Sequence, residues 1–248
     1  GGKDGGKDGP DCLYRIRFEG KSAVEGQVFE IADYDVLWDC RIGSRKVKFR
    51  TPMFITEAPS NVVAVDAATG RQYWRYDHEL PDDLRICCGR NNRGVAILGE
   101  TLYMSTLDAK LVAIDARTGN LVWNTEVADY RSGYSKTAAP LIVKDLAIIG
   151  IAGGEYGVRG FFDAYDVNTG ELVWRHYTVP GEGEPGSETW SGDSYKTGGA
   201  PAWTIGAYDP ELNTLYWTTG NPAPDWNGDA RLGDNLYSDS VLAIDPDT

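Results

Sequence analysis

Residues 147–174 read AIIGIAGGEYGVRGFFDAYDVNTGELVW, and this stretch decides the fold. It opens with an apolar run, 147–152, interrupted only by Gly150, which is typical of a strand buried on both faces. It closes with two alternating segments joined by an Asp-x-x-Thr-Gly turn that begins at Asp166 and is followed by Trp174. The Asp side chain can accept hydrogen bonds from turn amides, and Gly supplies the positive φ that the turn requires. The stretch therefore predicts a buried strand followed by a β-hairpin.

The same hairpin recurs along the chain. Its other copies are NVVAVDAATGRQYW (61–74), KLVAIDARTGNLVW (110–123) and the incomplete SVLAIDPDT (240–248). The aspartates at 66, 115, 166 and 245 follow one another at intervals of 49, 51 and 79 residues. A period near 50 residues with a hairpin in each copy indicates repeated β-blades. The long last interval contains a Gly- and Pro-rich insertion around 180–200 and a second loop near 221–238.

Two further strands are predicted between successive hairpins. They are expected in 93–108, 140–152 and 202–220, with turns at 99–100, 144–145 and 209–211. Four strands in roughly fifty residues are typical of a propeller blade. We therefore predict an all-β fold, a partial β-propeller of about three to four blades that occupies residues 51–248.

The predicted blades differ in completeness. Two are complete, at about 93–128 and 139–179, one is nearly complete and ends at 248, and an earlier one retains its outer half. In that earlier blade, residues 51–63 pass from one strand directly into the repeat hairpin, which leaves no room for a second strand. Either the blade is degenerate or residues have been deleted there. Three or four blades cannot close a ring, so unpaired strand edges are expected.

The first fifty residues give a weaker signal. Residues 1–10 form the tandem repeat GGKDGGKDGP, which is expected to be disordered or tag-like. In 11–50, the segments YRIRF and QVFEI alternate like strands, but no repeat assigns their pairing. Because residue 1 is Gly and the chain stops inside a repeat copy, we expect a fragment of a longer protein.

Composition excludes several classes of function. The chain has 248 residues, 42% of them hydrophobic, and a formal net charge of −13 at pH 7. Its longest basic block is the short RKVKFR at 45–50, so a nucleic-acid partner or an anionic membrane surface is not expected. No run of eighteen apolar residues is present, and no transmembrane helix is predicted.

Two local features carry chemistry. Glu155 follows two glycines, which let a backbone approach a ligand closely, so its carboxylate either faces a cavity or is solvated in a tight turn. Cys87 and Cys88 are adjacent, and they form either two independent thiols or a strained disulfide that closes a rigid apolar ring. Cys12 and Cys40 lie in the unassigned N-terminal segment, where their pairing stays open. Without a Cys-x-x-Cys motif and with two histidines, a zinc site is not expected.

Five motifs occur in an order and spacing that resemble the quinoprotein alcohol dehydrogenases, the methanol and ethanol dehydrogenase family that uses pyrroloquinoline quinone (PQQ). The motifs are CCGRNNRG (87–94), TAAP (137–140), GGEYGVRG (153–160), TWSGDSYKTGG (189–199) and TGNPAPDWNGD (219–229). The resemblance covers about residues 51–248, roughly the N-terminal half of the family's eight-bladed propeller.

This resemblance implies roles for individual residues. Cys87 and Cys88 are similar to a vicinal disulfide that lies against one face of PQQ, and Trp203, eighteen residues before Asn221, is similar to the indole stacked on the other face. Arg93 matches an arginine paired with a PQQ carboxylate. Glu155 and Asn221 match two ligands of a Ca²⁺ or lanthanide ion, for which oxygen donors are suited. Further positions implied to line the cofactor are Thr137, Ala152, Gly153 and Gly154.

The sequence also departs from the family pattern. A glutamate common before the first blade's Thr/Ala-Pro segment falls at Phe49, so this position departs from one of the family's cofactor contacts. The family's catalytic aspartate is expected after Thr248, as are a second basic PQQ contact and the remaining C-terminal blades. Asp234 and Asp239 lie in an insertion loop and are expected to be structural rather than substitutes for that base. The isolated 248-residue chain is accordingly expected to show no alcohol oxidation.

The resemblance implies a periplasmic PQQ- and Ca²⁺-dependent enzyme that oxidises a primary alcohol to an aldehyde. Its electrons would pass to cytochrome c or a membrane quinone, and a vicinal disulfide would fit the oxidising periplasm. Two alternatives are a non-enzymatic propeller scaffold built from the same repeat and a sugar dehydrogenase that binds the same quinone. The scaffold requires neither the cysteine pair nor Glu155 and Asn221 at these spacings, and the sugar enzymes usually lack the vicinal cysteines.

Overall fold

The computed structural model describes residues 11–19, 33–42, 45–49 and 52–247, with side chains described from residue 52 onward. The regular elements in these ranges are β-strands and 3-10 helices of three or four residues, which confirms the predicted all-β class. The chain divides into two compact units, 1–54 with 64–73 and 55–63 with 74–248. No helix of the described residues has the length and apolar character needed to cross a bilayer. The predicted character of residues 1–10 falls outside the described residues.

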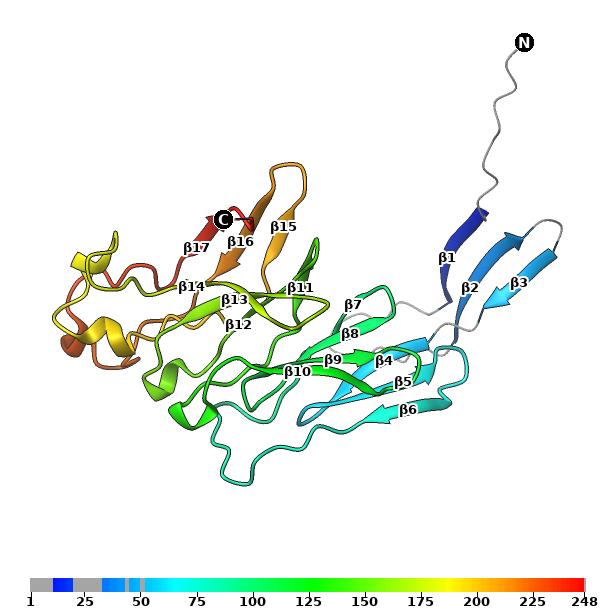
Figure 1. Ribbon diagram of the computed structural model, residues 1–248, viewed down its shortest axis with the longest axis horizontal. Helices are drawn as coiled ribbons and strands as arrows, with labels where there is room; N and C mark the ends of the chain where they lie inside the picture. Colours follow the sequence, from blue (N-terminus) through cyan, green and yellow to red (C-terminus); the bar gives the residue numbers. More distant parts are fainter. Residues whose placement is uncertain (1–10, 20–32, 43–44, 50–51, 248) are drawn as a thin grey trace, which may run out of the picture. The chain divides into compact units, whose positions relative to one another are not determined.

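The first unit contains a three-stranded antiparallel sheet in the order β1-β2-β3 (Figure 1). Its strands are β1 (Asp11–Glu19), β2 (Asp33–Ile42) and β3 (Arg45–Phe49). The predicted YRIRF strand lies within β1, whereas QVFEI falls outside the described residues. The backbone register places Cys12 opposite Cys40. A disulfide between them would depend on side chains that lie outside the described part of the chain.

The first repeat copy forms a three-stranded sheet in the order β4-β5-β6. The strands are β4 (Pro52–Glu57), β5 (Asn61–Asp66) and β6 (Gln72–Tyr76). Only residues 58–60 connect β4 to β5. This confirms that the segment has no room for a second strand before the repeat hairpin.

Three more sheets follow in the second unit, and they confirm two complete blades and one nearly complete blade (Figure 1). The first complete blade contains β7 (Ala96–Leu98), β8 (Thr101–Ser105), β9 (Lys110–Asp115) and β10 (Leu121–Glu126). The second contains β11 (Leu141–Val143), β12 (Leu146–Gly150), β13 (Phe161–Asp166) and β14 (Leu172–Tyr177). The third contains β15 (Ala207–Asp209), β16 (Thr214–Thr218) and β17 (Val241–Ile244).

The repeat turn has the predicted hydrogen bonds. Asp115 Oδ1 accepts from the amides of Arg117 and Thr118 at 3.0 and 2.8 Å. Asp66 and Asp166 accept from the equivalent amides in their own turns. The turn glycines all have positive φ angles, 69° at Gly70, 77° at Gly119 and 72° at Gly170. One aspartate and one glycine therefore fix each hairpin turn.

The tryptophan that ends each hairpin joins one repeat copy to the next. Trp74 Nε1 donates to the carbonyl of Ala116 at 3.1 Å, and Trp174 Nε1 donates to that of Pro246 at 2.9 Å. Each acceptor directly follows the aspartate of the next copy. The Trp74 ring also covers Gly119, where an added Cβ would lie 2.6 Å from Trp74 Cε3. We call the hydrogen bond from a hairpin tryptophan to the next repeat copy the tryptophan link.

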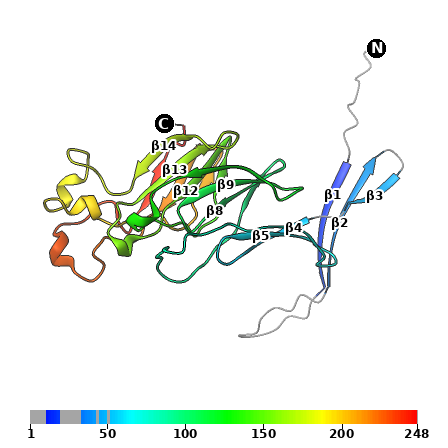
Figure 2. The same ribbon diagram turned by 60° about the horizontal axis from the view of Figure 1, so that its bottom comes forward.

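The core clusters of the second unit contain side chains from neighbouring sheets. Figure 2 shows the backbones of these sheets, with β8 and β9 in one and β12, β13 and β14 in the next. Successive side chains of a strand point to opposite faces, and β13 uses this alternation to join two core clusters. Phe161 packs in the cluster that includes Leu111 of β9, and Phe162 packs in the cluster that includes Trp217 of β16. The rings of Phe162 and Trp217 are stacked, with centroids 5.1 Å apart and an interplanar angle of 6°. Burial on both faces, predicted for 147–152, is confirmed for Ile148 and Ile149 of β12, which face these same two clusters.

Candidate functional site

One hollow of about 250 Å³ collects residues from five loops of the second unit. Three of these loops precede β7, β11 and β15, and the other two follow β12 and β16. Nine of the ten predicted site residues line it, together with Gly89, Asn91, Ser135 and Pro201: Cys87, Cys88, Arg93, Thr137, Ala152, Gly153, Glu155, Trp203 and Asn221. The tenth, Gly154, lines an adjacent hollow that is described below. Residues up to 134 positions apart in sequence thus share one cavity.

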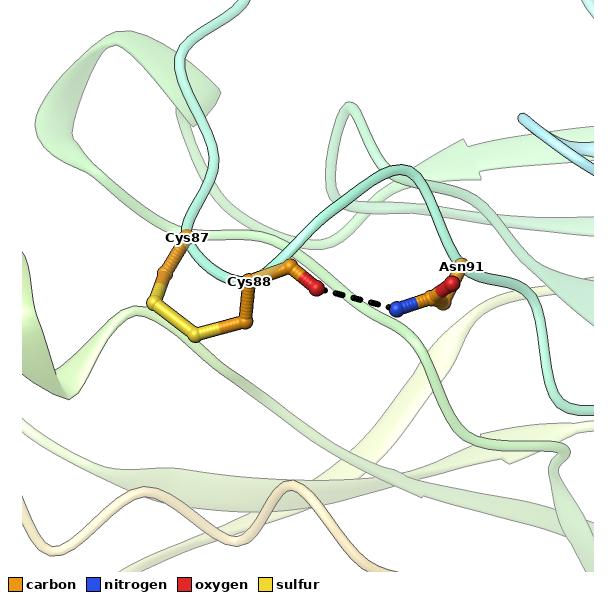
Figure 3. Close-up of a disulfide and its surroundings, with 3 residues drawn as sticks. All are labelled: Cys87, Cys88 and Asn91. Atoms are coloured by element: carbon orange, nitrogen blue, oxygen red, sulfur yellow. Dashed lines mark hydrogen bonds between the residues drawn. A yellow bond between two sulfur atoms is a disulfide. The ribbon is translucent and has the colours of Figure 1, made fainter.

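Cys87 and Cys88 form a disulfide at one side of this hollow (Figure 3). Cys88 has a φ of 67°, so the loop adopts a left-handed conformation at a non-glycine residue. The side chain of Asn91 donates from Nδ2 to the carbonyl of Cys88 at 3.0 Å, which braces the ring from the backbone side. Of the two possibilities left by the sequence, the structure has the disulfide rather than two thiols.

Glu155 lies beside that disulfide. A carboxylate oxygen of Glu155 and the two Sγ atoms are all within 4.8 Å of one another. Because the sulfurs are bonded to each other, they are not the thiolates that a metal ion would need. The carboxylate is therefore the donor that this group offers to a hard cation.

Glycine brings Glu155 to this position. After β12, Ala152 and Ser135 form an antiparallel bridge, with hydrogen bonds of 2.8 and 3.2 Å between their backbones. Gly153 follows with a φ of 113°, and an added Cβ would lie 2.1 Å from the carbonyl oxygen of Gly133. No other residue fits there without moving the backbone, and the 3-10 helix η2 (Gly154–Tyr156) then presents Glu155.

Arg93 and Trp203 supply a cation and an aromatic ring. The guanidinium carbon of Arg93 lies 5.6 Å from the Trp203 ring centroid, within the range of a cation–π contact. The Arg93 amide donates to the carbonyl of Thr137 at 3.0 Å, which ties two loops of the hollow together. Trp203 is 43% exposed although it is a large aromatic residue. An exposed indole beside a guanidinium provides a surface for a flat anionic ligand.

Asn221 is held by its backbone and its side chain. Its carbonyl accepts from the Ala200 amide at 2.9 Å. Its side-chain nitrogen donates to Asp225 Oδ1 at 2.5 Å and to the Pro222 carbonyl at 3.3 Å. The side-chain oxygen is thus the atom of Asn221 left for a cation.

A second hollow, of about 450 Å³, shares Glu155 with the first. Its other lining residues are Gly154, Gly157, Thr197, Ala223, Pro224, Asp225, Trp226 and Asn227. Trp226 is 98% exposed. Sequence reasoning did not single out Asp225, Trp226 or Asn91 as functional, although all three lie inside the quoted motifs. Asp234 and Asp239, predicted to be structural, line neither hollow.

A buried lysine lies between two residues that line the first hollow. Lys136, between Ser135 and Thr137, is 1% exposed, and its Nζ donates to the carbonyl of Gly150 at 3.0 Å. Burial lowers the pKa of Lys136 to about 7, although the nearby carboxylate of Asp163 acts in the opposite direction. A lysine between two pocket residues gave no sign in the sequence that it would be buried.

The fold is a partial β-propeller whose interstrand loops line the first hollow. The family model described as "Glucose/ethanol/alcohol dehydrogenase, beta-propeller domain" matches residues 42–248. The quinoprotein alcohol dehydrogenase PedH of Pseudomonas putida is 50% identical over an alignment of 212 residues that covers 79% of this chain and 35% of that protein. The chain therefore belongs to the PQQ family of glucose, ethanol and alcohol dehydrogenases.

Solved structures of relatives agree with the fold. A europium-containing methanol dehydrogenase superimposes with a TM-score of 0.75 and 36% identity, covering 81% of this chain and 39% of that one. The quinohemoprotein alcohol dehydrogenase of Comamonas testosteroni superimposes with a TM-score of 0.72 and 38% identity, covering 82% of this chain and 33% of that one. The chain spans about a third of the length of the relatives it matches.

Proposed function

We propose that residues 51–248 form the PQQ-binding part of a dehydrogenase that oxidises a primary alcohol to an aldehyde. The observation that carries this proposal is the single hollow that gathers a vicinal disulfide, an exposed indole, a guanidinium and a glycine-presented carboxylate. Family membership and the names of the relatives support the same activity.

The lining residues fit a flat, anionic quinone. The Cys87–Cys88 ring and the Trp203 indole would hold its two faces, because both are apolar and border the same hollow. Arg93 would pair with a carboxylate of the cofactor through a charge-assisted hydrogen bond. Thr137, Ala152 and the glycines at 153 and 154 would contact its edge through hydroxyl and backbone groups. The antiparallel bridge between Ser135 and Ala152 would hold the backbone of positions 152–154 close to the cofactor.

Glu155 and Asn221 would hold a Ca²⁺ or lanthanide ion. Both offer oxygen atoms, which are the ligands that such ions prefer, and both line the hollow. Bound PQQ with its metal ion would supply the carbonyl group that takes two electrons from the alcohol. The second hollow, which shares Glu155, would bind the alcohol beside that centre, with Ala223, Pro224 and Trp226 as apolar contacts.

The electrons would pass to a cytochrome c or a membrane quinone, and the protein would act in the periplasm. The relative from Comamonas testosteroni is named a quinohemoprotein, which supports a haem-linked acceptor. The Cys87–Cys88 disulfide supports an oxidising compartment, since cytosolic thiols are kept reduced.

Reconstitution tests this proposal. PQQ and Ca²⁺, or PQQ and La³⁺, are added to the purified protein, and the absorbance spectrum and the thermal unfolding midpoint are recorded. We expect a perturbed quinone spectrum and a raised midpoint, because a ligand that binds only the folded state stabilises it. Glu155→Gln should lose the metal-dependent part of both signals. A protein indifferent to PQQ with either metal would instead be a propeller scaffold.

A further inference from the structure

Asp225 contacts the predicted metal ligand Asn221 directly. Asp225 Oδ1 accepts a hydrogen bond from Asn221 Nδ2 at 2.5 Å. The same nitrogen also donates to the Pro222 carbonyl at 3.3 Å. Both N–H groups of the amide therefore have acceptors within one short segment, 221–225. Asp225 belongs to the second hollow and Asn221 to the first.

The hydrogen bond with Asp225 determines the orientation of the Asn221 side-chain amide. An asparagine amide presents a donor end, NH₂, and an acceptor end, the carbonyl oxygen, and the two ends have nearly the same shape. An ionised carboxylate can only accept hydrogen bonds. Asp225 is therefore compatible with only one of the two amide orientations, the one that turns NH₂ toward it. The carbonyl oxygen is then the end left for the hollow.

This orientation matters only if a cation binds. A cation is attracted to the amide oxygen and repelled by the NH₂ group, so a rotated Asn221 would oppose binding. The backbone of Asn221 is fixed by the Ala200 amide, so rotation of the side chain is the freedom that remains. Groups that hold a metal ligand in position are typically worth roughly 10- to 100-fold in metal affinity.

We propose that Asp225 is a positioning residue for the metal site, which locks the Asn221 amide with its oxygen toward the cation. This inference rests on the proposed function, because it requires a cation at Glu155 and Asn221. Asp225 does not touch the cofactor hollow itself, since it is absent from the residues that line it. Its role is exerted through Asn221.

The test uses Tb³⁺ alone as the probe, added to the purified full chain without PQQ. Indole excitation sensitises Tb³⁺ luminescence, and Trp203 and Trp226 border the two hollows that meet at Glu155. The Tb³⁺ signal of the site is the part lost in Glu155→Gln. We expect Asp225→Asn to weaken this Tb³⁺ affinity roughly 10- to 100-fold, because an asparagine at 225 accepts either amide orientation.

Two further variants separate orientation from charge. Asp229→Asn removes the same single charge from an exposed residue of the same loop, in η5 (Gly228–Arg231), and should leave Tb³⁺ affinity nearly unchanged. Asn221→Asp replaces the amide by a carboxylate whose two oxygens are equivalent. In that background Asp225→Asn should no longer weaken Tb³⁺ binding, because there is no orientation left to fix.

The outcomes are distinguishable. If Asp225→Asn weakens Tb³⁺ binding equally in the parent protein and in the Asn221→Asp variant, Asp225 acts on the metal ion only through its charge. That result would overturn this inference but not the proposed function. So would an Asp225→Asn protein that binds Tb³⁺ like the parent. A parent protein without any Glu155-dependent Tb³⁺ signal would overturn the proposed function, and this inference with it. Thermal unfolding of each metal-free variant checks that the fold is retained.

Discussion

The indole Nε1 of Trp123 donates a hydrogen bond of 3.2 Å to the carbonyl oxygen of Val167, 44 residues further along the chain. The bond crosses from β10 to the turn that follows β13, and thus from one sheet to the next. It is the middle member of the three tryptophan links. The links connect successive blades where their backbones do not pair.

Removing the indole nitrogen of Trp123 should show how much one tryptophan link contributes to the free energy of unfolding. Trp123→Phe keeps an aromatic ring but loses the donor, so we expect the free energy of unfolding to fall by at least about 1 kcal/mol. Urea unfolding followed by circular dichroism would give this value. Trp226→Phe is the control, because Trp226 is 98% exposed and should change stability little. Equal losses in the two variants would contradict a role for the link.

Gly119 should tolerate alanine poorly for two reasons. Its φ is 77°, and an added Cβ would lie 2.6 Å from Trp74 Cε3. A left-handed alanine costs about 1–2 kcal/mol and overpacking about 1–3 kcal/mol, so Gly119→Ala should lose about 2–5 kcal/mol in thermal or urea unfolding. Gly99→Ala supplies the comparison. Gly99 also has a positive φ, 59°, but an added Cβ would meet nothing within 4 Å. Its loss should be limited to the backbone cost.

Lys136 should make stability depend on pH. Its pKa falls from 10.5 to about 7 in the folded protein because of burial, with Asp163 opposing the shift and Arg175 adding to it. Between about pH 7 and 10.5 the unfolded chain binds the proton that the folded chain has released. The free energy of unfolding therefore rises with pH across this window, and the full burial penalty remains below about pH 7.

The variant Lys136→Met removes this dependence. Replacing a buried charge by an apolar side chain of similar length should stabilise the protein by about 1–4 kcal/mol near pH 6–7. The gain should shrink as pH approaches 10, because the proton that folding releases from Lys136 costs less to remove as the pH nears the unfolded pKa of 10.5. Urea unfolding of both proteins at pH 6, 8 and 9.5 would check it. A difference in the free energy of unfolding between the two proteins that stays constant with pH would contradict the lowered pKa of Lys136.

Arg93→Lys should weaken PQQ binding about tenfold, because a lysine lacks the planar fork that pairs with a carboxylate and the charge-assisted hydrogen bond is weakened. Quenching of tryptophan fluorescence by added PQQ would report it, since Trp203 lies beside Arg93. Arg117→Lys is the matched control, because Arg117 pairs with Glu100 on the surface, with 69% of its side chain exposed. A similar loss in both variants, or no loss in Arg93→Lys, would contradict a specific pairing of the Arg93 guanidinium with a PQQ carboxylate.

The blades could be predicted because their signals are local. An aspartate accepts bonds from amides two and three residues later, and a glycine adopts positive φ in the same turn, so each hairpin is determined by a dozen residues. The two-residue turns at 99–100 and 144–145 were also predicted from local sequence, because each separates two strand-like segments. In contrast, β2 mixes charged and apolar residues without a repeat, and its pairing with β1 and β3 could not be predicted from sequence.

The candidate site was predicted by its motifs, and its supporting contacts were not. Nine of the ten predicted positions border one hollow, but the contact of Asp225 with Asn221 depends on loops ordered by long-range backbone bonds. The backbone amide of Asp239, for example, donates to the Gly220 carbonyl at 3.0 Å. Lys136 shows the same limit. Nothing in its local sequence indicates burial, yet it is 1% exposed.

The third tryptophan link, from Trp174 to Pro246, closes over an interval of 72 residues, whereas the first, from Trp74 to Ala116, spans 42. The attachment between neighbouring blades is thus indifferent to how much chain is looped out between them. The 72-residue interval contains the loops that carry Trp203, Asn221 and Asp225, so these loops lie outside the contact that joins one blade to the next.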